Sequence, residues 1–413
     1  MRGTDRVFSR PGPGAAGGAY VAGLRPGDHN GPMRIAQLAN FVAPHSGGMR
    51  VALDGLGREY VAAGHERILI VPGLRDAEVE TASGVVCQIA SPRVSGTYRM
   101  IVRPGAVRRA LRRFRPTNVE CSDKWTLAWT GRWATHHGVG SVLFSHERLD
   151  DMLAGWLRTR RPMRRMVGFL DRRIVPRFDR VVVASQYAAE EFAAWSPRVR
   201  VVPLGVDLSE FRPLPRTPRD AGAALRLVLV SRLSREKDPQ LAIDAVLELH
   251  RRGVPVRLDV FGSGPDEEAL RSRARGGPIT FHGFIADRRE LSARLGAADL
   301  SLSVSPKETF GLVVLEALAS GTPVLTSNRG GAREIITPGA GVVDEPASGH
   351  VPWGAWAPSR PTALAEAIEQ LIGRLGPGMR RAARQRAEQF SWQDCAHRML
   401  QVHQETLGDG GRQ

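Results

Sequence analysis

The segment from Ser305 to Thr326 constrains the fold of this chain more than any other part of it. It reads SPKETFGLVVLEALASGTPVLT, and a short apolar run of strand length precedes it while another forms its end. This order predicts a strand, a loop, a helix over residues 311–321, and a second strand. Glu316 interrupts the apolar face of that helix, and Glu308 lies in the loop before it. The two carboxylates can therefore face one polar ligand near a helix N-terminus, where backbone amides attract anions.

Strand-like and helix-like runs alternate along most of the chain. Apolar runs such as MRIAQLANF, RILIVPG, GSVLFS, DRVVVAS and LRLVLVS are each followed by a segment with helical periodicity. This alternation predicts an α/β fold in which parallel sheets are covered by helices on both faces. A chain of 413 residues is long for one core and allows two such domains. The proline- and glycine-punctuated run VVPLGVDLSEFRP is the predicted boundary between them.

Two loops after predicted strands carry groups suited to phosphate. Gly47 and Gly48 lie between the first strand and a helix that Gly64 is placed to cap, so their amides could approach a phosphate. Two glycines are equally typical of an ordinary turn. Arg232 and Lys237 lie in the loop after LRLVLVS and can converge on a diphosphate, although surface cations are usually only solvated.

Two further positions follow from local signals. Asp238 is predicted to cap the helix after the Lys237 loop, with Pro239 as the first helical residue. His146 directly follows the strand VLFS, and open parallel sheets bind ligands beyond the carboxyl ends of their strands. A single histidine is more often structural than functional, so its role stays open on this ground alone.

The motifs ETFGLVVLE and ALASGTPV together resemble the signature of retaining glycosyltransferases of family 4, and SRLSREK resembles the phosphate-binding motif of the same family. The resemblance covers nearly the whole chain. It implies the GT-B fold, in which two Rossmann-like domains have parallel sheets that face a central cleft. We therefore expect a disordered arm over residues 1–32, an acceptor domain over 33–208, a donor-nucleotide domain over 209–390, and a C-terminal helix within 391–413 that crosses back to the first domain before a tail.

The resemblance also implies a role for each site residue. Glu316 would bind the ribose hydroxyls of a nucleotide-diphospho-sugar, Glu308 would hold the hexose, and Lys237 would act on the leaving diphosphate. The predicted residues are Arg232, Lys237, His146 and Glu308 for catalysis; Gly47, Gly48, Phe310, Gly311, Leu312 and Glu316 for the donor; and Asp123 and Lys124 for the acceptor. No protein nucleophile is identified, so the resemblance implies attack from the face of the leaving group.

The substrates are predicted from two further stretches. VECSDKWTL and SHERLD are most similar to the branch that transfers mannose from GDP-mannose to lipid acceptors. No cofactor is expected, and no metal, because Asp150 and Asp151 are adjacent instead of spaced as D-x-D. The alternatives are a UDP-sugar-dependent transferase with a soluble or other glycolipid acceptor, and a nucleotide-sugar epimerase or phosphorylase on the same fold.

The net charge of +16 is concentrated in the first half of the chain, where residues 1–212 hold 32 of the 58 basic and 19 of the 42 acidic residues. Residues 158–180 alone contain nine arginines among several large apolar residues. Such a helix can lie on anionic lipid, so an anionic membrane surface is a predicted partner. The alternative explanation is an arginine-rich composition. Nucleic acid is not a predicted partner, because no binding motif is present and aromatic residues make up 6% of the chain.

The expected location follows from what the chain lacks. No apolar run approaches the roughly 20 residues that span a bilayer, and no signal-peptide pattern opens the sequence. Cys87, Cys121 and Cys395 have neither metal-binding nor disulfide spacing and are expected to be reduced. We therefore expect a cytoplasmic protein that lies peripherally on the inner face of the cell membrane.

Overall fold

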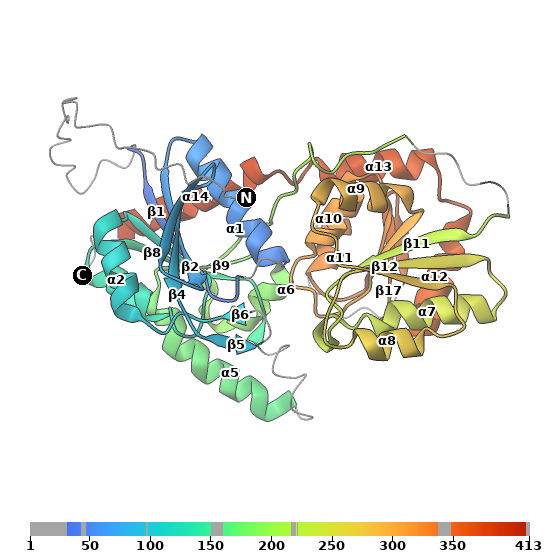
Figure 1. The fold of residues 1–413 in the computed structure, drawn as a ribbon, viewed down its shortest axis with the longest axis horizontal. Helices are drawn as coiled ribbons and strands as arrows, with labels where there is room; N and C mark the ends of the chain where they lie inside the picture. Colours follow the sequence, from blue (N-terminus) through green and yellow to red (C-terminus); the bar gives the residue numbers. More distant parts are fainter. Residues whose placement is uncertain are drawn as a thin grey trace, which may run out of the picture. The chain divides into compact units, whose positions relative to one another are not determined.

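Two separate sheets organise the protein (Figure 1). The computed structural model describes residues 31–42, 47–95, 98–149, 160–215, 220, 222–337 and 348–409. Residues 32–413 group into one compact unit by their contacts, distinct from residues 1–31. The boundary expected near residue 208 stays a prediction, although one sheet is built from strands before it and the other from strands after it.

The first sheet has eight strands in the order β10-β9-β8-β7-β1-β2-β4-β3, and all neighbours are parallel except β3 and β4. Its strands are β1 (Arg34–Leu38), β2 (Glu66–Gly73), β3 (Ala77–Thr81), β4 (Gly84–Ala90), β7 (Asn118–Cys121), β8 (Gly140–Ser145), β9 (Arg180–Val183) and β10 (Val199–Val201). A hairpin of β5 (Arg93–Ser95) and β6 (Tyr98–Arg99) is separate. The helices are α1 (Gly48–Ala62), α2 (Pro104–Phe114), α3 (Trp129–His136), α5 (Arg160–Ile174) and α6 (Gln186–Ala189).

The second sheet has seven strands in the order β13-β12-β11-β14-β15-β17-β16, with only β16 antiparallel to its neighbour. Its strands are β11 (Leu225–Val230), β12 (Val256–Phe261), β13 (Ile279–Gly283), β14 (Leu300–Ser303), β15 (Val324–Ser327), β16 (Gly349–Val351) and β17 (Gly354–Ala357). The helices that follow β11 in the chain are α7 (Gln240–Arg251), α8 (Glu267–Arg273), α9 (Arg288–Ala297), α10 (Leu312–Ala319), α11 (Gly331–Ile336), α12 (Pro361–Ile372), α13 (Pro377–Ala387) and α14 (Trp392–Asp409). The predicted α/β class with parallel sheets is confirmed.

Glycines with positive φ mark the helix ends where the sequence places them. Gly311 (φ +102°) precedes α10, and Gly321 (φ +73°) follows it. Gly64 (φ +84°) lies just beyond the last residues of α1. Only a residue without Cβ adopts these conformations at low cost.

The predicted capping role of Asp238 is wrong. Asp238 adopts a left-handed conformation (φ +45°) at the end of the short 3-10 helix Arg235–Lys237, Pro239 takes the N-cap position, and α7 begins at Gln240. The Asp238 carboxylate instead pairs with Lys307 at 2.9 Å. The Asp238 carboxylate therefore binds the Lys307 ammonium and not the backbone amides of α7.

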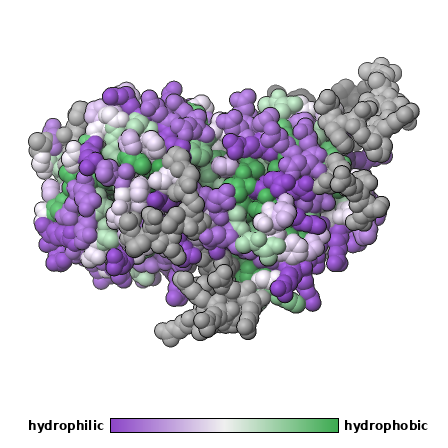
Figure 2. All heavy atoms as spheres, turned by 180° about the vertical axis from the view of Figure 1, so that it is seen from behind, coloured by the Kyte–Doolittle hydropathy of each residue, from purple (hydrophilic) through white to green (hydrophobic). Residues whose placement is uncertain are grey.

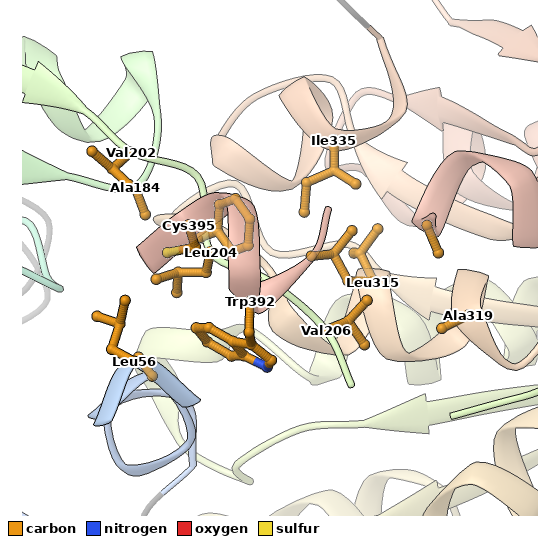
Figure 3. Close-up of a cluster of buried hydrophobic side chains, with 14 of the residues drawn as sticks. Leu56, Ala184, Val202, Leu204, Val206, Leu315, Ala319, Ile335, Trp392 and Cys395 are labelled. Atoms are coloured by element: carbon orange, nitrogen blue, oxygen red, sulfur yellow. The ribbon is translucent and has the colours of Figure 1, made fainter. Parts of the chain in front are cut away.

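One hydrophobic cluster joins α14 to elements from both halves of the chain (Figure 3). Trp392 and Cys395 of α14 pack among Leu56 of α1, Leu315 of α10, and the segment that follows β10. The packing excludes side chains at nearby glycines, since a Cβ on Gly55 would lie 2.6 Å from the Trp392 ring. Helix α14 therefore packs against elements of both sheets.

A buried polar network fixes the far part of α14 to the first sheet. Glu120 of β7 accepts hydrogen bonds from Gln37 (2.8 Å) and Tyr60 (3.0 Å) and lies 3.2 Å from Nε2 of His403, all fully buried. Burial opposes the charge of Glu120, but the contact with His403 and the other hydrogen bonds hold the pKa of this carboxyl below its usual value. The C-terminal helix therefore lies on the first sheet through a buried polar contact as well as through apolar packing.

The surface is mostly polar on the face shown in Figure 2, where hydrophobic residues form smaller groups between hydrophilic ones. Among the residues that the structure describes, no helix is long and apolar enough to cross a membrane. All three cysteines are buried and unpaired.

Candidate functional site

Several of the predicted site residues lie just beyond the carboxyl ends of parallel strands, in both sheets. Lys237 follows β11, Glu308 follows β14, and both strands are neighbours in the second sheet. His146 follows β8, while Asp123 lies just beyond β7, the neighbour of β8 in the first sheet. Loops at this edge of a parallel sheet are where open α/β folds bind ligands.

Two adjacent ion pairs connect the loops after β11 and β14. Nζ of Lys237 lies 2.9 Å from Oε2 of Glu308, and Nζ of Lys307 lies 2.9 Å from Oδ2 of Asp238. Burial opposes the charge of Lys237, but Glu308 and other carboxylates outweigh it and raise the pKa of the ammonium. The structure thus brings together two of the predicted catalytic residues and keeps Lys237 cationic.

A second charged cluster surrounds Glu316 in α10. Arg288 at the start of α9 donates to Oε1 of Glu316 at 3.0 Å and to Glu210 at 3.0 Å. The side chain of Glu316 is only 6% exposed. Burial raises the pKa of Glu316, and the Arg288 guanidinium opposes that rise. Glu316 is therefore buried with a cation beside it.

Arg232 lies at the same edge but in a more open position. Its side chain is 46% exposed, its nearest acidic partner is Glu236 at 3.4 Å, and its guanidinium lies 5.2 Å from the Tyr98 ring. It makes no ion pair with Glu308 or Glu316 within the described part of the chain. The guanidinium thus presents donors that a ligand could use.

The two predicted glycine positions differ in their surroundings. A Cβ on Gly48 would lie 3.4 Å from Cδ1 of Leu312, so these two predicted donor residues are close together. A Cβ on Gly47 would meet nothing within 4 Å. Phe310 is buried, and Gly311 brings its backbone against Ala332, where a Cβ would lie 3.1 Å away.

His146 is held as a neutral imidazole. Its ring stacks on Phe144 with the centroids 4.2 Å apart, and its Nε2 lies 3.0 Å from the Ser122 hydroxyl. Burial lowers the pKa of His146 to about 4. Its backbone carbonyl accepts a hydrogen bond from Thr309 at 2.9 Å. The residue next to Glu308 thus contacts the end of β8 directly.

The two predicted acceptor residues have different environments. Asp123 is buried, and its Oδ2 accepts hydrogen bonds from the backbone amides of Trp125 and Leu127, whereas Oδ1 has no partner within the described residues. Burial raises the pKa of this carboxyl despite those hydrogen bonds. Lys124 is 8% exposed at its side chain and is ion-paired with Glu191, so its ammonium would have to leave that partner to reach a ligand.

Sequence reasoning missed Arg288, the partner of Glu316. A local signal was available, because a cation in the first turn of a helix opposes the helix dipole and is an uncommon choice there. It also missed the Thr309 hydrogen bonds, to the His146 carbonyl and from the Ser185 hydroxyl, which no local pattern encodes.

No metal site is formed by the residues that the structure describes, since no three His, Cys, Asp or Glu side chains gather in them. Asp150 and Asp151 lie outside those residues.

Two family profiles match the chain. The profile described as Glycosyltransferase Family 4 matches residues 46–210, and the one described as Glycosyl transferases group 1 matches residues 224–374. The two matched segments contain all but one of the strands of the first sheet and all of the strands of the second.

A curated relative matches most of the chain. The GDP-mannose-dependent alpha-(1-6)-phosphatidylinositol dimannoside mannosyltransferase of Mycobacterium tuberculosis is 42% identical over 378 residues, which are 89% of this chain and 95% of the relative. Among solved structures, the sucrose-phosphate synthase of Thermosynechococcus elongatus has a TM-score of 0.69 at 19% identity and covers 90% of this chain and 98% of its own. Anabaena HepE in complex with UDP and glucose has a TM-score of 0.66 at 18% identity, with coverages of 89% and 98%. These structural likenesses confirm the fold.

Proposed function

This chain is a glycosyltransferase of family 4, and from that premise we propose that it transfers mannose from GDP-mannose to a mannosylated phosphatidylinositol lipid. The donor and the class of acceptor are those in the name of the Mycobacterium tuberculosis relative, which is similar over nearly its whole length. The observation that carries the proposal is the pairing of two carboxylates with cations at one edge of the second sheet, Lys237 with Glu308 and Arg288 with Glu316.

The donor lies across this edge in the proposed complex. The ribose hydroxyls bind the Glu316 carboxylate, and the hexose binds Glu308 together with the backbone of Phe310, Gly311 and Leu312. When the donor binds, the Lys237 ammonium leaves Glu308 and binds the diphosphate, and the Glu308 carboxylate then accepts hydrogen bonds from the sugar hydroxyls. Carboxylates suit this task because each oxygen accepts hydrogen bonds from neighbouring hydroxyls.

Transfer breaks the bond between mannose C1 and the diphosphate oxygen. A hydroxyl oxygen of the acceptor forms the new bond to C1 on the same face, and its proton passes to an oxygen of the leaving diphosphate. Lys237, Arg232 and the amides of Gly47 and Gly48 stabilise the charge that accumulates on that diphosphate more than they stabilise the bound donor. Retention of the anomeric configuration follows from attack on that face.

The first-sheet residues contact the reacting sugar and the acceptor. His146 is neutral near pH 7, since burial lowers its pKa to about 4, so it acts as a hydrogen-bonding group and not as a cation. Asp123 is the acceptor residue with an unused oxygen, Oδ1, which is buried and without a hydrogen-bond partner in the described chain. Lys124 reaches an acceptor only if it leaves Glu191.

The lipid acceptor requires the enzyme to lie on a membrane, and α5 is the proposed contact. In its described side chains, Met166 (43%) and Phe169 (52%) are exposed, and Arg173 lies over the Phe169 ring at 4.4 Å. Apolar side chains flanked by arginines are typical of helices that lie in an anionic lipid interface. In this proposal the protein acts at the cytoplasmic face of the membrane.

The decisive experiment is a donor and acceptor panel. The purified protein is incubated with radiolabelled GDP-mannose, UDP-glucose or UDP-galactose, each with and without mannosylated phosphatidylinositol. We expect label in the lipid only with GDP-mannose. Transfer from a UDP-sugar would replace the donor assignment, and a changed sugar nucleotide without any acceptor would favour an epimerase.

The membrane proposal has its own test in vesicle binding. Replacing Arg172 and Arg173 with serine should weaken binding to anionic vesicles, measured by sedimentation, about 30-fold, at roughly 1 kcal/mol for each of the two basic residues. The control replaces Arg289 and Arg381, which are exposed on α9 and α13 and remove the same charge. Equal weakening in both variants would attribute binding to net charge, and α5 would then not be the contact.

A further inference from the structure

We infer that Arg288 is a positioning residue for donor binding, which holds the ribose-binding carboxylate of Glu316 in place through one oxygen and leaves the other oxygen for the ligand. The inference rests on the proposed role of Glu316. It assigns a function to a residue that lies 28 positions before Glu316, outside the motifs SRLSREK and ETFGLVVLE.

The geometry divides the two oxygens of Glu316 between protein and ligand. Arg288 donates to Oε1 at 3.0 Å, while Oε2 has no hydrogen-bond partner among the residues that the structure describes. The side chain of Glu316 is 6% exposed, so rotation about its bonds is restricted by the packing of α10. A carboxylate fixed at one oxygen presents the other in one direction, which is what recognition of a ribose hydroxyl requires.

Arg288 is itself fixed on its other sides. Its Nε donates to Glu210 at 3.0 Å, and its guanidinium lies 4.7 Å from the ring of Phe211. Both of these residues belong to the run VVPLGVDLSEFRP that joins the two halves of the chain. The planar guanidinium can bridge two carboxylates at once, which a lysine ammonium on a flexible stem does less well.

Two charged groups act on the buried Glu316 carboxyl most strongly, the Arg288 guanidinium and the Glu210 carboxylate. Arg288 comes from α9 and Glu210 from the joining segment, while Arg384 of α13 is occupied by the backbone carbonyls of Ala319 and Phe211 near the end of α10. Burial raises the pKa of Glu316, and Arg288 opposes that effect. Without Arg288, the carboxyl would be buried beside Glu210 and would bind a proton more readily.

The test compares GDP with 2′,3′-dideoxy-GDP by calorimetry in the unmodified protein, Arg288→Met, Arg288→Lys and Glu316→Gln. We expect the unmodified protein to prefer GDP by about ten-fold or more, the scale for hydrogen bonds to a charged group. Arg288→Met should lose most of that preference while its affinity for dideoxy-GDP changes less than about three-fold. Arg288→Lys should keep part of it. The control is Arg289→Met, which removes the neighbouring exposed arginine of α9 and should leave both affinities unchanged.

A pH series separates positioning from a structural role. In Arg288→Met the affinity for GDP should fall as the pH is lowered, and it should fall more than in the double variant Arg288→Met/Glu316→Gln, because only the former retains the Glu316 carboxyl, whose pKa burial raises. Equal loss of both nucleotides in Arg288→Met, with the fold intact by circular dichroism, would overturn the inference and indicate a diphosphate contact. Equal binding of both nucleotides by the unmodified protein would overturn the ribose role of Glu316, and the inference with it. If Arg288→Met does not fold, Arg288→Lys decides: a reduced preference for GDP over dideoxy-GDP supports the inference, and an unchanged preference overturns it.

Discussion

Replacing Lys237 with methionine removes one cation from the proposed diphosphate site while keeping the length of the side chain. In the structure its ammonium lies 2.9 Å from Glu308, and its side chain is 34% exposed. Burial opposes the charge, but Glu308 and neighbouring carboxylates raise the pKa of Lys237 above its usual value. The group is therefore cationic throughout the range of a transfer assay, and the substitution removes a full charge at pH 7 or 8.

The size of the effect follows from what the ammonium contacts in each state. A bound donor must compete with Glu308 for Lys237, so the gain on donor binding is partly offset by the lost ion pair. In the transition state the diphosphate carries more negative charge and the ammonium stabilises it more. We expect kcat to fall by about 10²- to 10³-fold, the scale of a single preorganised electrostatic group, and the donor KM to change by less than about ten-fold.

The assay is transfer of radiolabelled mannose at saturating donor, with folding checked by circular dichroism. The matched control is Lys307→Met, because Lys307 is 30% exposed, has an ion pair of the same 2.9 Å length with Asp238, and lies in the same cluster. We expect kcat of the control to fall by less than about five-fold, because partly exposed ion pairs contribute little. Parental kcat in Lys237→Met would refute the diphosphate assignment, and equal losses in both variants would attribute the effect to the charge of the loop as a whole.

The remaining predictions concern donor binding, stability and the N-terminal arm. Glu316→Gln should weaken GDP binding by about 1.5–3 kcal/mol in calorimetry, because a charge-assisted contact to ribose is lost; unchanged affinity would contradict it. His403→Leu should lower the free energy of unfolding in urea by about 1.5–3 kcal/mol, since it removes one of the three hydrogen-bond partners of the buried Glu120 carboxylate. Glu405→Gln, on the same helix, is the contrasting variant. It should lower the free energy of unfolding by less than about 1 kcal/mol, because Glu405 is 37% exposed beside Arg180 and Arg200. The depressed pKa of Glu120 adds stability above pH 4.5 that is lost as the pH falls through the folded value, so acid unfolding should begin below about pH 4.5; a flat urea midpoint from pH 7 to pH 3 would exclude this. A chain that begins at Met33 should keep its fold and activity, since residues 1–32 have no pattern that could bury a core; loss of folded protein would show that the arm is structural.

Local sequence signals were sufficient for the elements and for the loops that carry three of the predicted site residues. The alternation of apolar runs and helical periodicity predicted parallel sheets, and the ends of those runs placed Lys237, Glu308 and His146 on loops at the carboxyl edge. Gly311 and Gly64 marked helix ends because glycine alone accepts positive φ cheaply. These features depend on residues within a few positions of one another, so they can be read along the chain.

The pairings of charged groups were decided only by the tertiary structure. Lys237 meets Glu308 because β11 and β14 are neighbours in the sheet although two strands separate them in the sequence, and strand order has no local signal. Asp238 pairs with Lys307 instead of capping α7 for the same reason. Glu120 and His403 lie 283 positions apart and meet because α14 returns to the first sheet. Burial and long-range charge depend on the whole fold, and they therefore determine which charged groups pair and in which direction the pKa of a buried carboxyl such as that of Glu316 is shifted.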